Sequence, residues 1–191
     1  MKFNSDIDID FGNRDDILQH IKHLPAAMRN VKPLRKHATG IHVTDVPVDA
    51  VNGMASIDYT EAEKRGYLKL DLLNVHVYEK VRDEDHLVSL MRNPNWSRLN
   101  DPKFVEKLIH LGNHYQNMKK MPEPVDSITR LAMFLAVIRP GKKHLMGKRW
   151  IEVGASIWDK GTDGYTFKQA HAIAYAQLVV VHMNLLEEQG N

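Results

Sequence analysis

Hydrophobic and polar residues alternate over residues 4–11, near the start of the chain. Successive side chains of a strand point to opposite faces, so alternation with a period of two predicts a strand. One face of this strand would carry three carboxylates and the other three apolar groups. The acidic residues are Asp6, Asp8 and Asp10, and the apolar ones are Ile7, Ile9 and Phe11.

Further elements follow from the same patterns. Strands are predicted over residues 41–46, 54–58 and 67–72, the last because leucines alternate there with Tyr67, Lys69 and Asp71. Pro25 and Pro33 mark a basic connector. Apolar residues at helical spacing predict helices over residues 14–23, 74–91, 104–111, 127–138, 150–158 and 169–186.

Strands early and helices late predict an α+β fold. We expect a small mixed sheet in residues 1–74 and a helical region in residues 75–191, packed as one compact unit. The most apolar helix still contains His171, Gln177 and His182. A membrane span needs about 20 apolar residues without such groups, so we expect a buried core helix and no membrane association.

Composition narrows the function classes only slightly. The chain has 191 residues and no cysteine, which excludes disulfides, cysteine-ligated zinc and thiol catalysis, and fits an intracellular protein. The first residues turn acidic without an apolar segment, so we expect no signal peptide. The net charge of +2 does not indicate nucleic-acid binding. Two basic stretches, 29–37 and 142–149, either contact phosphates or form ordinary solvated surface.

Common catalytic motifs are absent from the sequence. It contains no GxGxxG, no Walker A loop and no GxSxG, so a serine nucleophile has no support. His110 and His114 could share a helix face as zinc ligands, but Gly112 lies between them and no third ligand follows at a suitable spacing. The acidic strand remains the main candidate for chemistry.

Two interpretations of the acidic strand stay open on the residues alone. It can be an edge strand whose charged face discourages aggregation. Alternatively, Asp71 joins Asp6 and Asp8 around one point, provided that the two strands are neighbours. Converging carboxylates hold the divalent ions of two-metal phosphoryl transfer, and oxygen-only ligands suit Mg²⁺ or Mn²⁺.

Five segments, in order, resemble the palm and fingers of the bacterial DNA polymerase III alpha subunit, a C-family DNA polymerase. SDIDIDFGNRDDILQHI resembles its P-D-x-D-x-D-F palm run, and RKHATGIHVTDVPV its H-A-A-G-V-V-I segment. GYLKLDLLNVHVYEKVRD is similar to its G-L-V-K-F-D-F-L-G-L stretch. DSITRLAMFLAVIRPG and YTFKQAHAIAYAQLVVVH resemble two finger segments. The resemblance implies a palm-like sheet and a finger-like helical lobe.

The resemblance also implies roles for individual residues. Asp6, Asp8 and Asp71 would hold the catalytic Mg²⁺ or Mn²⁺, while Asp10 would be structural or would support these ligands. Contacts to nucleotide or DNA are implied for Arg35, Lys36, His37, Lys69, Arg139 and His171. DNA and a dNTP would then be the partners.

The sequence also departs from the family. It is several times shorter, and we expect it to lack the palm loop that grips the triphosphate. GNHYQNM stands at 112–118, where the family has G-V-F-Q-x-E-S. Such a fragment suits a phage or mobile element. Two hypotheses follow: a minimal nucleotidyltransferase, or a non-catalytic DNA-binding or polymerase-accessory module, acting in the cytoplasm (the host's, if phage-encoded), with a replication protein or a second copy as partner.

Overall fold

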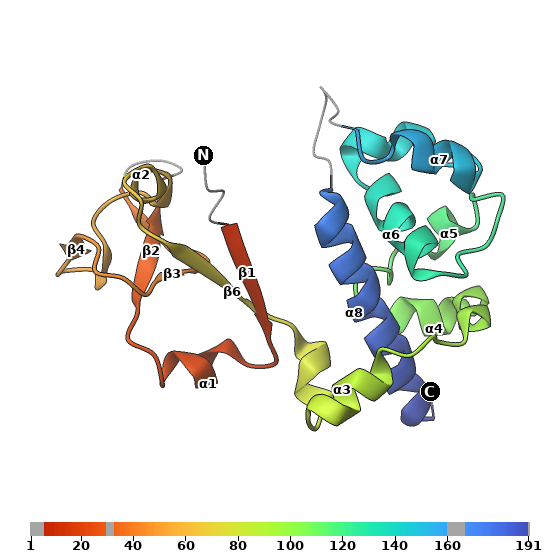
Figure 1. Cartoon of the computed structure of the whole chain (residues 1–191), viewed down its shortest axis with the longest axis horizontal. Helices are drawn as coiled ribbons and strands as arrows, with labels where there is room; N and C mark the ends of the chain where they lie inside the picture. Colours follow the sequence, from red (N-terminus) through yellow and green to blue (C-terminus); the bar gives the residue numbers. More distant parts are fainter. Residues whose placement is uncertain (1–5, 30–32, 160–166, 191) are drawn as a thin grey trace. The chain divides into compact units, whose positions relative to one another are not determined.

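The computed structural model describes residues 6–29, 33–159 and 167–190. The chain forms two compact units, Met1–Lys80 and Val81–Asn191, and each is described by itself (Figure 1). The expected α+β class is confirmed, because a four-stranded mixed sheet forms early in the chain and helices follow it.

The sheet of unit 1 has the strand order β1-β6-β3-β2. Strand β1 runs parallel to β6, whereas β3 is antiparallel to both β6 and β2. The strands are β1 (Asp6–Phe11), β2 (Leu24–Met28), β3 (Arg35–His42) and β6 (Lys69–Asn74). Because β6 lies between β1 and β3, the acidic strand is the neighbour of the strand that carries Asp71.

Short elements connect these strands. They are α1 (Arg14–Leu18), a β4–β5 hairpin (Val48–Asp49 and Met54–Ala55), α2 (Tyr59–Lys64) and the 3-10 helix η1 (His76–Lys80). Asp58 begins α2 by accepting a hydrogen bond from the Thr60 N–H (2.9 Å). Helix α2 follows the hairpin in the chain and begins with Tyr59, whose aromatic ring contacts the candidate site.

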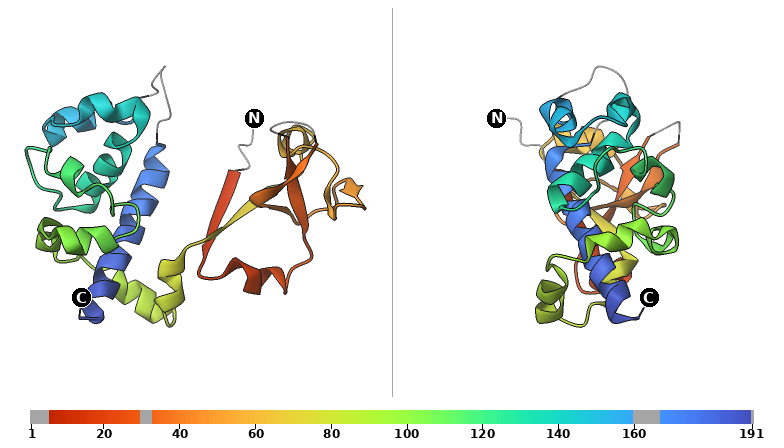
Figure 2. Two further views of the ribbon diagram at one scale, coloured as in Figure 1. Left: turned by 180° about the vertical axis from the view of Figure 1, so that it is seen from behind. Right: turned by 90° about the vertical axis from the view of Figure 1, so that its right-hand side faces the viewer.

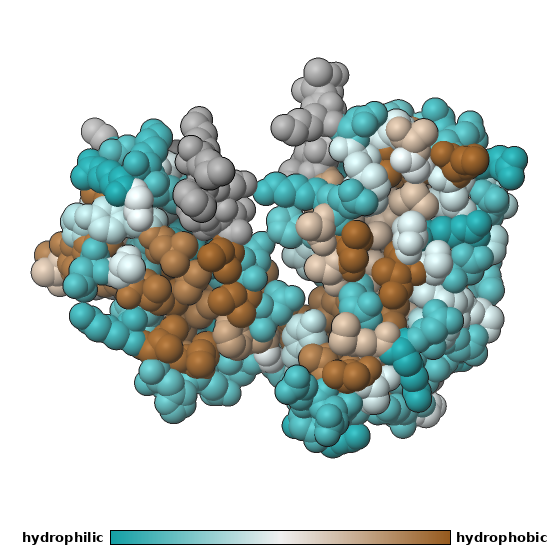
Figure 3. Space-filling model, in the orientation of Figure 1, coloured by the Kyte–Doolittle hydropathy of each residue, from teal (hydrophilic) through white to brown (hydrophobic). Residues whose placement is uncertain are grey.

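One surface of unit 1 is unusually apolar. Figure 3 shows hydrophobic residues gathered over this unit, and Ile7 and Ile9 on β1 are 43% and 37% exposed. On the opposite face of β1 the acidic residues alternate with them, as the sequence predicted. The strand therefore has one acidic and one apolar face, and neither face of β1 is deeply buried.

Unit 2 is helical. Its elements are α3 (Glu84–Leu90), η2 (Trp96–Asn100), α4 (Pro102–Lys107), α5 (Tyr115–Met118), α6 (Ile128–Val137), η3 (Pro140–Leu145), α7 (Trp150–Ser156) and α8 (Gln169–Glu188). Helix α6 is buried all round from Leu131 to Val137 and packs against the long α8 (Figure 2). Ser127 caps α6 by accepting a hydrogen bond from the Arg130 N–H (3.3 Å).

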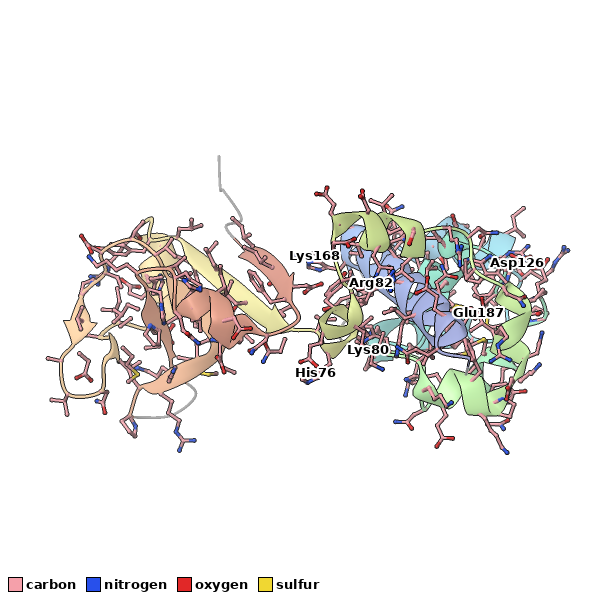
Figure 4. The ribbon with its side chains drawn as sticks, turned by 90° about the horizontal axis from the view of Figure 1, so that it is seen from below. His76, Lys80, Arg82, Asp126, Lys168 and Glu187 are labelled. Atoms are coloured by element: carbon pink, nitrogen blue, oxygen red, sulfur yellow. The ribbon has the colours of Figure 1, made fainter. Side chains whose placement is uncertain are left out.

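Polar contacts tie α3 to the C-terminal half of α8. The buried Asn184 donates hydrogen bonds to the carbonyl oxygens of Leu90 (2.8 Å) and Arg92 (2.9 Å). His86, also buried, bonds to the carboxylate of Glu188 (3.0 Å) one turn further along α8. Figure 4 labels Lys168 and Glu187, which mark the two ends of this helix.

Several predicted element bounds are wrong. The helix expected over 14–23 ends at Leu18, and the expected connector contains strand β2, whose Pro25 pairs with Ile41 of β3. The helix expected over 74–91 is instead η1 followed by α3, because the Asp83 side chain begins a new helix by accepting from the His86 N–H (2.7 Å). Among the described residues, no helix is long and apolar enough to cross a membrane.

Candidate metal and nucleotide site

The register of β1 and β6 brings two of the predicted acids together. Asp8 lies opposite Asp71, and Asp6 lies opposite Lys69. Paired residues of neighbouring strands project to the same face, so the side chains of Asp8 and Asp71 share one side of the sheet. The condition set by the sequence, that the two acidic strands be neighbours, is met. The side chain of Asp6 lies outside the described part of the chain.

Asp71 is the best-held group of the site. Its side chain is 10% exposed and accepts hydrogen bonds from the Lys69 ammonium through Oδ2 and from the Thr39 hydroxyl through Oδ1 (2.8 Å). Burial by itself would raise the pKa of Asp71. The hydrogen bonds from Lys69 and Thr39, and the charge of Lys69, outweigh burial and lower it. Asp71 is therefore an ionised carboxylate at neutral pH.

His37 is a neutral neighbour of this carboxylate. Its Nδ1 accepts a hydrogen bond from the Gly40 N–H (2.8 Å), so the ring proton is on Nε2. Burial lowers the pKa of His37, and this cause outweighs the attraction of Asp71. The 3.7 Å between Nδ1 and the Asp71 carboxylate is therefore a contact of a neutral ring and not an ion pair.

The aromatic ring of Tyr59 contacts both His37 and Lys69. The Tyr59 and His37 rings meet edge to face at 5.2 Å, and the Lys69 ammonium lies 5.2 Å from the centre of the Tyr59 ring. Gly40 pairs with Asp71 across the strands, and a Cβ there would lie 2.9 Å from the His37 Nδ1. A glycine is needed at this position so that His37 and Lys69 can approach the carboxylate.

Asp10 lies further along the acidic face. Partial burial and the nearby Asp8 carboxylate raise the pKa of Asp10. The pKa of Tyr78 on η1 is raised as well, by burial and by Asp10. The charge of Asp10 therefore interacts with Asp8 and with Tyr78.

The described side chains fit a divalent ion only in part. Asp8 is exposed and Asp71 is ionised, and carboxylate oxygens are the ligands that Mg²⁺ and Mn²⁺ prefer. Within the described part of the chain, however, no three His, Cys, Asp or Glu side chains are arranged around one point. The Lys69 ammonium also donates a hydrogen bond to one oxygen of the Asp71 carboxylate, Oδ2, which a metal ion would otherwise contact. The donor set is two carboxylates, with Asp6 adjacent in register.

The remaining predicted contact residues are Arg35, Lys36, Arg139 and His171. Lys36 and Arg35 are exposed at the start of β3, four and five residues before Gly40, which corresponds to about 13–17 Å along a strand. Arg139 and His171 belong to unit 2, where the Arg139 guanidinium lies 4.5 Å from the centre of the Phe167 ring and the His171 ring lies 6.3 Å from it.

Sequence reasoning missed three contributors to the site, namely Thr39, Tyr59 and Gly40. Thr39 and Gly40 immediately follow His37 and Ala38 in the chain. Only the β3–β6 register shows that this segment lies beside Asp71. Tyr59 comes from α2, and no local pattern indicates that its ring packs on Lys69. The signal was thus in the pairing of strands, which the sequence alone does not specify.

No protein-family model, curated protein or solved structure matches this chain. The resemblance to C-family DNA polymerases therefore rests on the five short segments, and the function drawn from it is a proposal.

Proposed function

We propose that the face of unit 1 that bears Asp8 and Asp71 is a divalent-metal site for nucleotidyl transfer. The observation that carries this proposal is the parallel β1–β6 register, which sets Asp8 directly opposite Asp71. Two carboxylates on adjacent strands, one of them kept ionised in a buried position, form the kind of oxygen-only site that suits Mg²⁺ or Mn²⁺.

Each residue then has a definite part in the reaction. Asp8 and Asp71 would hold Mg²⁺ or Mn²⁺, with Asp6 as a further ligand, and the bound ions would supply charge for the phosphates and activate the attacking hydroxyl. The primer 3′ oxygen bonds to the α-phosphorus of a dNTP, the bond to the bridging oxygen breaks, and pyrophosphate leaves. Lys69 and His37 are positioned to contact a phosphate once a cation replaces the ammonium at Asp71.

The Lys69–Asp71 contact favours a second candidate function, a non-catalytic DNA-binding or polymerase-accessory module. In that case the lysine replaces the metal permanently, and exposed basic residues such as Arg35 and Lys36 contact the phosphate backbone. Lys142 does not belong to such a surface, because it is buried and donates to the Ser156 carbonyl (2.6 Å). Partners in this proposal are DNA, a replication protein or a second copy, in the cytoplasm.

Metal titration separates the two functions. Calorimetry with Mn²⁺ and Mg²⁺ should show binding to the wild type that weakens at least about tenfold in Asp8→Asn and in Asp71→Asn. Asp45→Asn is the matched control, because that carboxylate is 98% exposed and lies outside the strands that carry Asp8 and Asp71. Equal metal binding in Asp71→Asn and Asp45→Asn would refute the metal site.

The DNA arm uses fluorescence anisotropy of a labelled oligonucleotide over a range of salt concentrations. A binding module predicts affinity that falls steeply with salt, survives Asp8→Ala and weakens when Arg35 and Lys36 are both changed to Ala. A DNA affinity that is insensitive to salt and to these basic residues would exclude it.

A further inference from the structure

Unit 2 contains a cavity whose lining carries two lysines, and none of its lining residues belongs to the site in unit 1. Its volume is about 320 Å³, far more than one water molecule occupies. It lies among α5, the end of α6 and η3, and Asp and Glu are absent from its described lining. The residues that line it are His114, Asn117, Lys120, Ile138, Lys143 and Met146.

Hydrogen bonds fix how three of these side chains are oriented. The Lys120 ammonium can only donate, so the Asn117 Oδ1 that faces it (3.4 Å) is the acceptor. The Asn117 amide nitrogen then faces the Nδ1 of His114 (3.1 Å) and donates to it. The proton of the neutral His114 ring must consequently be on Nε2. The network leaves an imidazole N–H and further ammonium hydrogens available as donors.

Positive charge accumulates around this network without a counter-charge. Burial lowers the pKa of His114, and the charges of Arg139 and Lys143 lower it further. Lys120, Arg139 and Lys143 take part in none of the ion pairs among the described residues. Lys120 and Lys143 both line the cavity, so an anion bound there would lie beside two ammonium groups.

From these contacts we infer that the cavity is a binding site for a phosphate group carried on an organic body. Lysine ammonium groups bind phosphate as point charges, and the His114 Nε2–H adds a directional donor. Ile138 and Met146 form the apolar part of the lining, which inorganic phosphate alone would leave without a contact. His114 and Asn117 lie in the 112–118 segment, where the sequence departs from the polymerase family. The resemblance to that family therefore does not imply this site.

The site goes beyond the function proposed for unit 1 and does not depend on it. It is tested on the full chain with four probes: thymidine 5′-monophosphate, thymidine, inorganic phosphate and an oligothymidylate. Calorimetry should show binding of the monophosphate that weakens about ten- to a hundredfold in Lys143→Ala, as expected for loss of a hydrogen bond to a charged group. Asn117→Asp, which places a negative charge in the cavity at nearly constant size, should weaken it similarly.

Lys148→Ala is the matched control, since Lys148 is an exposed lysine close in sequence that does not line the cavity. Its affinity should equal that of the wild type. Tryptophan fluorescence confirms that each variant is folded. If the oligothymidylate binds with the same dependence on Lys143 and the monophosphate does not, the phosphate belongs to a nucleic-acid strand, and the phosphate site stands.

Three results would overturn the inference. The first is equal affinity of Lys143→Ala and Lys148→Ala for the monophosphate and equal affinity of the two variants for the oligothymidylate. The second is thymidine binding as tightly as its monophosphate, which would remove the role of the phosphate. The third is inorganic phosphate binding as tightly as the monophosphate, which would remove the role of the organic body.

Discussion

Lys69 offers the most direct test of the site in unit 1. Its side chain is 4% exposed and that of Asp71 10%. Lys69→Met keeps an unbranched apolar stem and removes the charge, so that the ionised Asp71 is left beside Asp8 without a cation. Breaking a buried ion pair by removing one partner costs about 3–5 kcal/mol. A unit spanning Met1–Lys80 has roughly 4–12 kcal/mol of stability at typical values per residue, so the loss is a large share of it.

The assay must separate the two units. All three tryptophans, Trp96, Trp150 and Trp158, lie in unit 2, so tryptophan fluorescence follows that unit alone. Unit 1 is followed by hydrogen exchange of peptides that cover β1 and β6. We expect Lys69→Met to lose protection in unit 1 while the tryptophan transition is unchanged. Adding Asp71→Asn should restore much of the protection, because a neutral amide needs no cation.

The outcome that would refute this reasoning is a small effect. If Lys69→Met lowers the stability of unit 1 by less than about 1 kcal/mol, the contact behaves as a surface ion pair. The reasoning would also be refuted if adding Asp71→Asn did not restore the protection lost in Lys69→Met. Either finding would mean that Asp71 is not held ionised by Lys69.

Two further predictions concern packing and pH. Gly40→Ala should destabilise unit 1 by about 1–3 kcal/mol, seen as faster exchange in β3, because its Cβ would lie 2.9 Å from the His37 Nδ1 and 3.1 Å from the Lys69 Cδ; unchanged exchange would contradict the close packing. The hydrogen bond from His86 lowers the pKa of Glu188 in the folded protein. The contribution of Glu188 to the stability of unit 2 is therefore complete above its unfolded pKa of about 4.3 and is lost as the pH falls through its folded pKa. Urea unfolding followed by tryptophan fluorescence should show Glu188→Gln less stable than the wild type at pH 7 and the two alike at low pH, and a constant difference would contradict this.

Local patterns predicted the elements that carry a clear signal in their own sequence. Polar and apolar residues alternate over residues 6–11 and 67–72, and α6 is buried from Leu131 to Val137. β2 was missed because Pro25 suggested a break, although the neighbouring β3 supplies the pairing that makes this stretch a strand. Tertiary pairing of this kind overrides local propensity, and one sequence gives no direct sign of it.

The site could be predicted as a set of residues but not as a set of contacts. The alternation of residues 67–72 placed Lys69 and Asp71 on one face, and the structure shows their side chains in contact. Which of them meets Asp8 depends on the register, and a shift by one residue would have turned Asp71 away. The Thr39 hydroxyl and the Tyr59 ring reach the site from other elements, so they had no local signal.

In the two proposed functions, Lys69 and a divalent ion would be alternative partners for the Asp71 carboxylate, and their competition would decide between these functions. For a metal to bind, the ammonium must leave Asp71, while its stem is confined by Gly40 and Tyr59. The metal affinity of the wild type is therefore reduced by whatever this displacement costs. Lys69→Met removes that cost, and stabilisation by Mn²⁺ should reach about 2.7 kcal/mol at a concentration one hundred times the dissociation constant. Wild-type affinity equal to that of Lys69→Met would mean that Lys69 leaves Asp71 freely and is available to a substrate phosphate. Binding by Lys69→Met alone would mean that the lysine closes the metal site, which leaves DNA binding as the function of this face. Lack of stabilisation in both proteins would refute the metal site and leave the ion-pair result standing.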